Sequence, residues 1–425
     1  MRTSPALQTD RYELSMYAAL LAERRTGAPA TFELFARRLP EGRRFGMTAG
    51  LGRFLDALAE FRFDAAALAW LTEAGVVDET TAANLAAWRF TGDIDAYPEG
   101  EIWFPNSPIL SVRAPLGEGL LLETLALSIL NHDSAIASAA ARMVLAANGR
   151  ALIEMGSRRT HEDAAVATAR AAYLAGFTTT SNLAAGALYG VPTAGTVAHA
   201  FVLSHASEGE AFDAQVRSQG ADTTLLVDTY DTTEGIATAV EVARTYGVSG
   251  PGAIRIDSGD LPTAVAAART QLDSLGATDT KIIVTSDLDE YLISELAPSA
   301  VDAYGVGTRV ATGSGHPTAG FVYKLVELDG RPVAKRASGK GNVGGAKTPY
   351  RYPDGREAFR VDGLIPAGAR PLQVAVVRGG AVVHRPALTD IRSYAASALA
   401  ALPAPARALT SGPPAASAEL EGEPS

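Results

Sequence analysis

The chain has 425 residues, a formal net charge of −10 at pH 7 and no cysteine. The acidic balance argues against a nucleic-acid-binding protein, which needs a basic surface, and the lack of cysteine excludes disulfides, thiol catalysis, iron–sulfur clusters and cysteine-ligated zinc. No apolar run approaches the roughly 20 residues of a membrane span, and no secretory signal pattern begins the chain, so we expect a cytoplasmic protein.

Residues 1–149 have the pattern of an α+β domain, in which helices pack on an antiparallel sheet. Asp10 or Thr9 is predicted to cap a helix that runs from Arg11 to Arg24. Further helices are expected at 49–61, 64–74, 79–89 and 118–148, and strands at 32–38 and within 93–115.

Residues 150–320 alternate strands with helices at the spacing of βα units, which predicts parallel strands and an irregular α/β barrel. Chemistry in such folds gathers at the carboxyl ends of the strands. Six predicted strands end on polar or glycine positions, which are Glu154, Gly195, Asp228, Asp257, Asp287 and Gly305.

Residues 321–402 return to a β pattern with hairpin turns, and we expect these hairpins to complete the N-terminal domain. Residues 403–425 are rich in proline, alanine, serine and glutamate, and we predict a disordered tail.

One of the chain's six histidines, His199, follows the short apolar run 191–194 and lies among small and apolar neighbours. A histidine in that place suits base, acid or nucleophile work near neutral pH, although a core histidine bonded to a carbonyl fits the same local pattern.

Arg255 and Asp257 lie two residues apart on a predicted strand and therefore share a face. Asp257 paired with Asp289 would suit ribose hydroxyls or a hydrated Mg²⁺.

Phosphate groups have three candidate binding regions. Residues 305–308 (Gly-Val-Gly-Thr) offer open backbone N–H groups after a strand, and Gly156 precedes Arg158 and Arg159, whose guanidinium groups bind oxyanions. Four of the five lysines fall between Lys324 and Lys347, where they would bind anions or lie on a solvated loop. Together these features predict a sugar phosphate bound beside a histidine.

Ordered motifs from about Leu7 to Arg351 resemble those of the nicotinate phosphoribosyltransferase family. They are Gln8-Thr-Asp-Arg-Tyr12, Glu33-Leu-Phe-Ala-Arg37, Glu154-Met-Gly-Ser-Arg-Arg159, Ser181-Asn182, Gly195-Thr-Val-Ala-His199, Leu226-Val-Asp-Thr-Tyr230, Arg255-Ile-Asp-Ser-Gly-Asp260 and Tyr304-Gly-Val-Gly-Thr308.

The resemblance implies a homodimeric enzyme that joins nicotinate to 5-phosphoribosyl-1-pyrophosphate in NAD salvage. It also implies Mg²⁺, and ATP hydrolysis coupled through a phosphohistidine at His199. Arg255 and Asp257 then lie at the catalytic centre, and Tyr12, with Asp10 beside it, comes from the neighbouring subunit. The remaining substrate-binding residues implied by the motifs are Met155, Arg158, Thr196, Asp289, Gly305, Gly307 and Thr308.

Two departures and three alternatives accompany this resemblance. His205 stands where the family suggests an apolar residue, and the region from Lys324 to Lys347 matches less tightly. The alternatives are a nicotinamide phosphoribosyltransferase, a quinolinate phosphoribosyltransferase and a non-catalytic regulator of the same fold.

Overall fold

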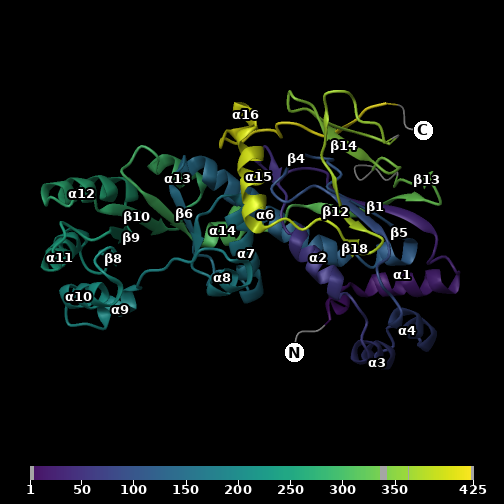
Figure 1. Ribbon diagram of the computed structural model, residues 1–425, viewed down its shortest axis with the longest axis horizontal. Helices are drawn as coiled ribbons and strands as arrows, with labels where there is room; N and C mark the ends of the chain where they lie inside the picture. Colours follow the sequence, from purple (N-terminus) through teal and green to yellow (C-terminus); the bar gives the residue numbers. More distant parts are fainter. Residues whose placement is uncertain (1–3, 336–341, 362, 423–425) are drawn as a thin grey trace. The chain divides into compact units, whose positions relative to one another are not determined.

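The computed structural model describes residues 4–335, 342–361 and 363–422. The chain forms two compact units, one made of Met1–Ser138 with His316–Ser425 and the other of Ala139–Gly315 (Figure 1). The sequence placed these divisions at 149 and 320. The first observed division falls inside helix α6 (Glu123–Ala147), which runs from one unit into the other.

The first unit is built on a seven-stranded sheet in the order β13-β12-β1-β5-β3-β17-β18. N-terminal strands β1 (Pro29–Ala36), β3 (Asp93–Ala96) and β5 (Leu110–Pro115) form its centre. Strand β12 (Phe321–Leu328) pairs antiparallel with β1, and β17 (Val374–Arg378) pairs antiparallel with β3. The prediction that C-terminal hairpins complete the N-terminal domain is therefore confirmed.

Helices and short strands surround this sheet. The helical segments are η1 (Pro5–Gln8), α1 (Arg11–Ala22), α2 (Leu51–Glu60), α3 (Ala65–Glu73), α4 (Glu79–Ala86), α5 (Leu116–Leu120), α15 (Leu388–Ala400) and α16 (Ala404–Arg407). The short strands are β2 (Gly46–Met47), β4 (Ile102–Trp103), β13 (Arg331–Pro332), β14 (Thr348–Arg351), β15 (Glu357–Arg360), β16 (Arg370–Pro371), β18 (Ala381–Val382) and β19 (Glu419–Leu420). Strands β16, β14, β15 and β19 form a separate four-stranded sheet, and β2 pairs with β4.

The single helix predicted at 118–148 is two helices, α5 and α6. The glycines of α5 allow close packing, because a Cβ on Gly119 would lie 2.6 Å from the Phe32 ring and one on Gly117 would lie 2.9 Å from the Tyr17 ring. Helix α5 thus packs closely against β1 and α1.

The predicted disordered tail is wrong for residues 403–422. Strand β19 pairs parallel with β15, and the Glu421 carboxylate accepts hydrogen bonds from Tyr350 (2.7 Å) and Tyr352 (2.8 Å). Ala406 and Ala418 are buried. A few small side chains and one carboxylate are enough to hold this segment, although its composition is typical of disorder.

The second unit contains a six-stranded sheet in the order β7-β6-β11-β10-β9-β8, whose strands all pair in parallel. The strands are β6 (Ala151–Glu154), β7 (Thr179–Thr180), β8 (Thr224–Leu226), β9 (Ala253–Ile256), β10 (Lys281–Ser286) and β11 (Ala303–Val306). The expected α/β architecture is confirmed as a curled, open sheet, half of a barrel.

Helices connect these strands, and Figure 1 shows α10, α11 and α12 following one another beside β8, β9 and β10. The helical segments are α7 (Glu162–Ala175), α8 (Leu183–Tyr189), α9 (His199–Leu203), α10 (Glu208–Gln219), α11 (Thr232–Thr245), α12 (Leu261–Ser274), α13 (Glu290–Leu296), α14 (Thr308–Ala311) and η2 (Gly313–Gly315). No helix in the described part of the chain is long and apolar enough to cross a membrane.

The strand predicted to end at Gly195 is absent among the described residues, and a single bridge between Thr193 and Thr180 takes its place. Pro192 accounts for this, because it has no N–H to donate and contributes only its carbonyl, which accepts a bond from Thr180 (2.9 Å).

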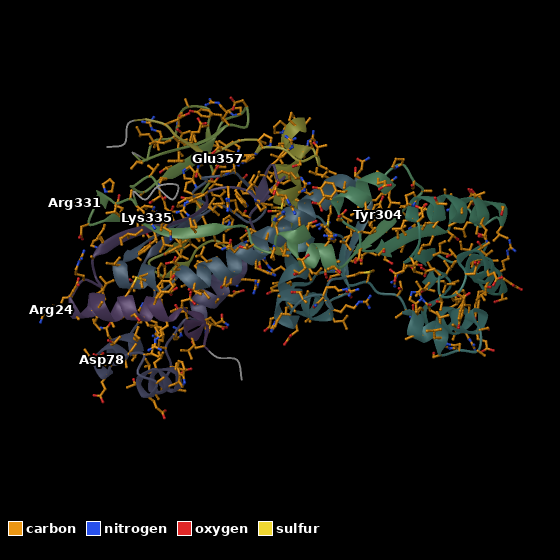
Figure 2. All side chains as sticks on the ribbon, turned by 180° about the vertical axis from the view of Figure 1, so that it is seen from behind. Arg24, Asp78, Tyr304, Arg331, Lys335 and Glu357 are labelled. Atoms are coloured by element: carbon orange, nitrogen blue, oxygen red, sulfur yellow. The ribbon has the colours of Figure 1, made fainter. Side chains whose placement is uncertain are left out.

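Buried side chains fill both units. Figure 2 labels Glu357 in the first unit and Tyr304 in the second, and their exposed fractions are 2% and 0%. Burial raises the pKa of Glu357, and the guanidinium of Arg351 opposes that shift. The buried carboxylate of Glu357 is thus paired with a cation, which compensates the cost of its burial.

Candidate functional site

The carboxyl ends of strands β9 and β10 hold a connected group of polar side chains. Arg255 leaves β9 and donates from Nε to Thr285 (2.9 Å), from Nη1 to Thr196 (3.0 Å) and from Nη2 to Asp257 (3.1 Å). Its side chain is only 12% exposed. The predicted pairing of Arg255 and Asp257 on one strand face is confirmed, and Thr196 joins them.

His199 begins helix α9 and reaches the same group. Its Nδ1 lies 3.1 Å from the Thr229 hydroxyl, and its Nε2 lies 3.8 Å from the Asp257 carboxylate. The imidazole is 40% exposed. The alternative of a core histidine bonded to a carbonyl is therefore wrong, since both ring nitrogens face polar side chains at an open site.

Asp228 is one of the six predicted polar strand ends, but it was not among the predicted catalytic or substrate-binding residues. Its Oδ2 accepts from the backbone N–H of Asp257 and from the hydroxyl of Ser258, both at 2.8 Å. Its Oδ1 is buried and has no hydrogen-bond partner in the ranges that the structure describes. Its position in the sequence could have indicated a role, because Asp228 lies two residues after β8 and Asp257 lies directly after β9.

Asp289, which was predicted to act with Asp257, also has a structural role. Asp289 is the N-cap of helix α13, and its Oδ1 accepts from the N–H groups of Tyr291 and Leu292, both at 3.0 Å. A carboxylate oxygen used in capping has less capacity left for a ligand.

Met155 and Gly305 lie on neighbouring strand ends beside Thr285. A Cβ on Gly305 would lie 2.5 Å from the Thr285 methyl carbon and 2.8 Å from the Met155 sulfur. Close packing thus requires glycine at position 305, which is buried within β11 (Ala303–Val306).

The loops after β6 and β11 carry the predicted phosphate-binding residues. The Met155 N–H donates to the carbonyl of Val306 (2.8 Å), which joins the two loops. Thr308 starts helix α14 after Gly307, and Arg158 is exposed. These residues therefore lie at the same sheet edge as the Arg255 group, with an arginine and open backbone available to an anion.

Buried Glu154 supports the loop after β6. Its carboxylate accepts from the Gly156 N–H and the Thr180 hydroxyl. Burial raises its pKa, although both hydrogen bonds oppose the shift. This carboxylate is a structural acceptor that shapes the loop carrying Arg158.

Asp10 and Tyr12 belong to the first unit. Asp10 is the N-cap of α1, without a side-chain capping bond, and Tyr12 lies in the first turn with 45% of its surface exposed. Burial of its hydroxyl and the nearby carboxylates of Glu123 and Glu13 raise the pKa of Tyr12. An exposed tyrosine next to an exposed aspartate is available for contacts outside its own unit.

His205 has a local role. Its Nδ1 lies 2.9 Å from the carbonyl of Phe201, and its ring packs edge-on against the Phe201 ring, with centroids 4.8 Å apart. Both contacts hold the end of helix α9, at whose start His199 lies.

Two lysines of the lysine-rich region lie beside carboxylates. Lys347 is buried and pairs with Glu33 (2.6 Å), and Lys324 lies 3.7 Å from Glu123. Lys340 lies outside the described residues. Because carboxylates neutralise Lys347 and Lys324, the anion-binding prediction is wrong for these two.

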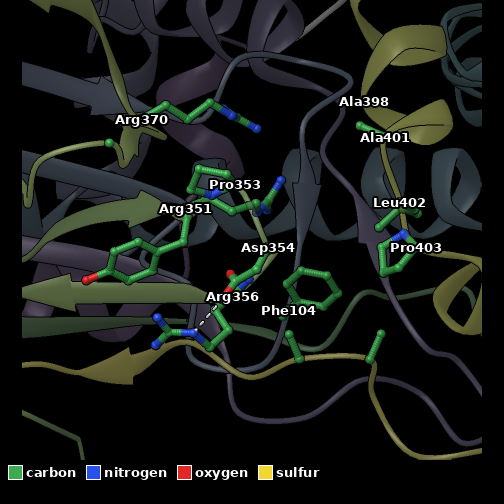
Figure 3. A pocket seen from close by; sticks show the side chains of 15 residues that line it. Phe104, Arg351, Pro353, Asp354, Arg356, Arg370, Ala398, Ala401, Leu402 and Pro403 are labelled. Carbon is green, nitrogen blue, oxygen red and sulfur yellow. Dashed lines mark hydrogen bonds and ion pairs between the residues drawn. The ribbon is translucent and has the colours of Figure 1, made fainter.

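A cavity of about 500 Å³ in the first unit is lined by Arg351, Arg356 and Arg370 (Figure 3). Arg351 pairs with Glu101 and Glu357, both at 2.7 Å, and Arg370 pairs with Glu101 at 2.8 Å. Arg356 bonds to the carboxylate two residues before it. These pairs leave no clear excess of positive charge, so the candidate site is the Arg255 group in the second unit.

Comparison with known proteins identifies the family of the chain. The model of the nicotinate phosphoribosyltransferase (NAPRTase) N-terminal domain matches residues 7–131, and the NAPRTase family model matches residues 151–348. The chain is 53% identical over 425 residues to nicotinate phosphoribosyltransferase pncB1 of Mycobacterium tuberculosis, covering 96% of this chain and 94% of the relative. It is 41% identical over 414 residues to pncB2 of the same organism, covering 95% and 89%.

Solved structures agree on the fold. Human nicotinic acid phosphoribosyltransferase superposes with a TM-score of 0.83 at 26% identity, covering 97% of each chain. Nicotinate-nucleotide pyrophosphorylase from Pyrococcus furiosus has a TM-score of 0.77 at 23% identity, covering 94% of this chain and 97% of the other, a likeness of fold alone. On the matched models and on the identity to curated relatives, the chain belongs to the nicotinate phosphoribosyltransferase family.

Proposed function

We propose that this protein joins nicotinate to 5-phosphoribosyl-1-pyrophosphate and releases nicotinate mononucleotide and pyrophosphate. The observation that carries the proposal lies at the strand ends of a chain of this family: Arg255 hydrogen-bonds to Asp257, and His199 Nε2 lies 3.8 Å from the same carboxylate. The nicotinamide alternative is dropped, because the matched family and the curated relatives are nicotinate enzymes.

In the reaction, the pyridine nitrogen forms a bond to ribose C1 as the bond from C1 to the pyrophosphate oxygen breaks. Positive charge develops at C1 in the transition state, and a carboxylate placed beside it stabilises that charge. Asp257 supplies the carboxylate, and Arg255 beside it offers a planar guanidinium to a substrate carboxylate or phosphate. The exposed Arg158 and the backbone N–H groups of Gly307 and Thr308, which follow β11, suit the 5′-phosphate and pyrophosphate groups.

ATP coupling is a second part of the proposal. An imidazole nitrogen of His199 would attack the γ-phosphorus of ATP, the bond from that phosphorus to the ADP oxygen would break, and a phosphohistidine would form. The 40% exposure of the ring and its contacts with Thr229 and Asp257 fit a nucleophile oriented by neighbours. The negative charge of the phosphohistidine would then attract nearby cationic groups.

The residues at the site fit Mg²⁺, which this reaction class uses. The free Oδ1 of Asp228 and the adjacent Asp257 are hard oxygen donors, and Mg²⁺ takes one or two carboxylates together with water and substrate phosphates. The described residues contain no cluster of three or more metal-ligating side chains, which is compatible with that mode. When bound, the ion would neutralise charge on the departing pyrophosphate.

The last part of the proposal is a homodimer in which Tyr12 and Asp10 of one subunit complete the site of the other. Its support is the exposure of both residues and their place in a motif of the family.

The test is product formation by the purified protein with phosphoribosyl pyrophosphate and Mg²⁺, with and without ATP. Nicotinate, nicotinamide and quinolinate are offered in turn, and the mononucleotide is measured by chromatography. We expect product from nicotinate only, more of it with ATP, and none from an Asp257→Ala variant. Product from nicotinamide in preference to nicotinate, or none from any of the three, would overturn the proposal.

A further inference from the structure

Thr285 belongs to none of the predicted motifs and is not one of the acidic strand ends. It nevertheless connects two proposed catalytic residues. Its side chain leaves the carboxyl end of β10, and the residue is 3% exposed. Its hydroxyl accepts a hydrogen bond from Arg255 Nε (2.9 Å) and donates one to Asp257 Oδ1 (2.7 Å). A hydroxyl has one hydrogen and two lone pairs, so it makes both bonds at once.

These hydrogen bonds form a closed ring that joins the side chains of Arg255, Thr285 and Asp257. Arg255 Nη2 also contacts Asp257 Oδ2 directly (3.1 Å), so guanidinium and carboxylate are joined at one point by their own atoms and at a second through Thr285. A pair joined at one point can pivot about that bond, whereas a pair joined at two points is held in one plane. The second point is supplied by a residue that need not touch substrate.

The hydroxyl of Thr285 cannot easily turn away. Its methyl carbon lies against position 305, where even a Cβ would approach to 2.5 Å, and threonine χ1 is stiff because Cβ is branched. The glycine of the next strand therefore fixes the threonine, and the threonine fixes the arginine and the carboxylate.

We propose that Thr285 is a positioning residue for phosphoribosyl transfer, holding Arg255 and Asp257 in their reactive arrangement; this rests on the function proposed above. Thr285→Val has nearly the same shape and removes only the hydroxyl. We expect it to lower kcat/KM for nicotinate by about 10- to 100-fold, the range typical of residues that orient functional side chains. Thr285→Ser keeps the hydroxyl, and we expect it to recover activity to within about threefold of the wild type.

Thr280 offers a matched control at the opposite end of β10. It is also 3% exposed, and its hydroxyl donates to the carbonyl of Pro251 (2.8 Å). Thr280→Val thus removes a buried hydroxyl bond of the same strand far from the strand's carboxyl end. We expect it to lower the thermal midpoint about as much as Thr285→Val while kcat/KM stays at the wild-type value.

A second measurement does not depend on catalysis. The Arg255 Nε–H signal, assigned by its loss in Arg255→Lys, should exchange slowly with water in the wild type and in Thr285→Ser, and rapidly in Thr285→Val. If the wild type forms no product from nicotinate, the proposed function fails while this measurement still tests the ring. Slow exchange in Thr285→Val, equal losses of activity in the valine and serine variants, or an equal loss in Thr280→Val would overturn the positioning role.

Discussion

Replacing Arg255 by lysine tests the proposed site with the smallest change of charge. Arg255 donates hydrogen bonds to the side chains of three different residues, and lysine, with a single nitrogen on a flexible stem, cannot reproduce that planar set. Hydrogen bonds to charged groups contribute about 1.5–3 kcal/mol each, and the ammonium recovers part of that. We therefore expect a loss of about 2–4 kcal/mol in transition-state stabilisation, or roughly 30- to 1,000-fold in kcat/KM.

The assay is steady-state kinetics with nicotinate varied at saturating phosphoribosyl pyrophosphate, and the control is Arg269→Lys. Arg269 lies on α12 and also makes three side-chain contacts, to Asp273 (2.8 Å), to the Thr280 carbonyl (2.8 Å) and to the Ala277 carbonyl (3.1 Å). Arg269 is not part of the proposed site. The Arg269→Lys substitution should therefore affect stability and leave kcat/KM unchanged. A folded Arg255→Lys protein with wild-type kcat/KM, or equal impairment of the two variants, would refute the reasoning.

Three further predictions follow from the same contacts. His199→Ala should abolish ATP-dependent phosphorylation, mapped by mass spectrometry in alkali, and label on His205 would contradict the assignment. Mixing inactive Tyr12→Ala and Asp257→Ala proteins should restore activity through hybrid dimers, and no recovery after proven subunit exchange would rule out a shared site. Although burial opposes it, contacts with arginines lower the pKa of Glu101 from its ordinary value of 4.5, so its contribution to stability is present above that value and lost as pH falls below it. Glu101→Gln should lower the free energy of unfolding by about 3–5 kcal/mol at pH 7 and by less in acid, as measured by urea unfolding, and an equal loss at both pH values would contradict the pairing.

The parallel sheet and its polar edge were predictable from the sequence because both depend on local patterns. Residues 151–154 and 253–256 are short strands followed by a polar turn and a helix, and parallel strands place such turns at one edge. The pairing of Arg255 with Asp257 also follows from a period of two residues. These two correct predictions therefore rest on residues that are neighbours in sequence.

Contacts between strands were less predictable, because they depend on register and on competing uses of each side chain. Asp228 and Asp289 look equivalent in the sequence, since each is an acid shortly after a strand. In the structure Asp289 caps α13, whereas Asp228 turns toward the backbone of Asp257. A helix that begins directly after an aspartate draws its carboxylate to the N-terminus, and this rule would have separated the two acids.

The role of Thr285 could not be predicted from the sequence for a related reason. Nothing around it in sequence marks a threonine at the end of an apolar strand as functional, because threonine is common in strands. Its importance arises only when β9 and β11 lie on either side, one bringing Arg255 and Asp257 to its hydroxyl and the other bringing Gly305 to its methyl group. Two neighbouring strands thus use the two branches of one side chain. For that reason the two substitutions separate the packing role from the polar one, because valine keeps the shape and loses the hydroxyl, whereas serine keeps the hydroxyl and loses the methyl group.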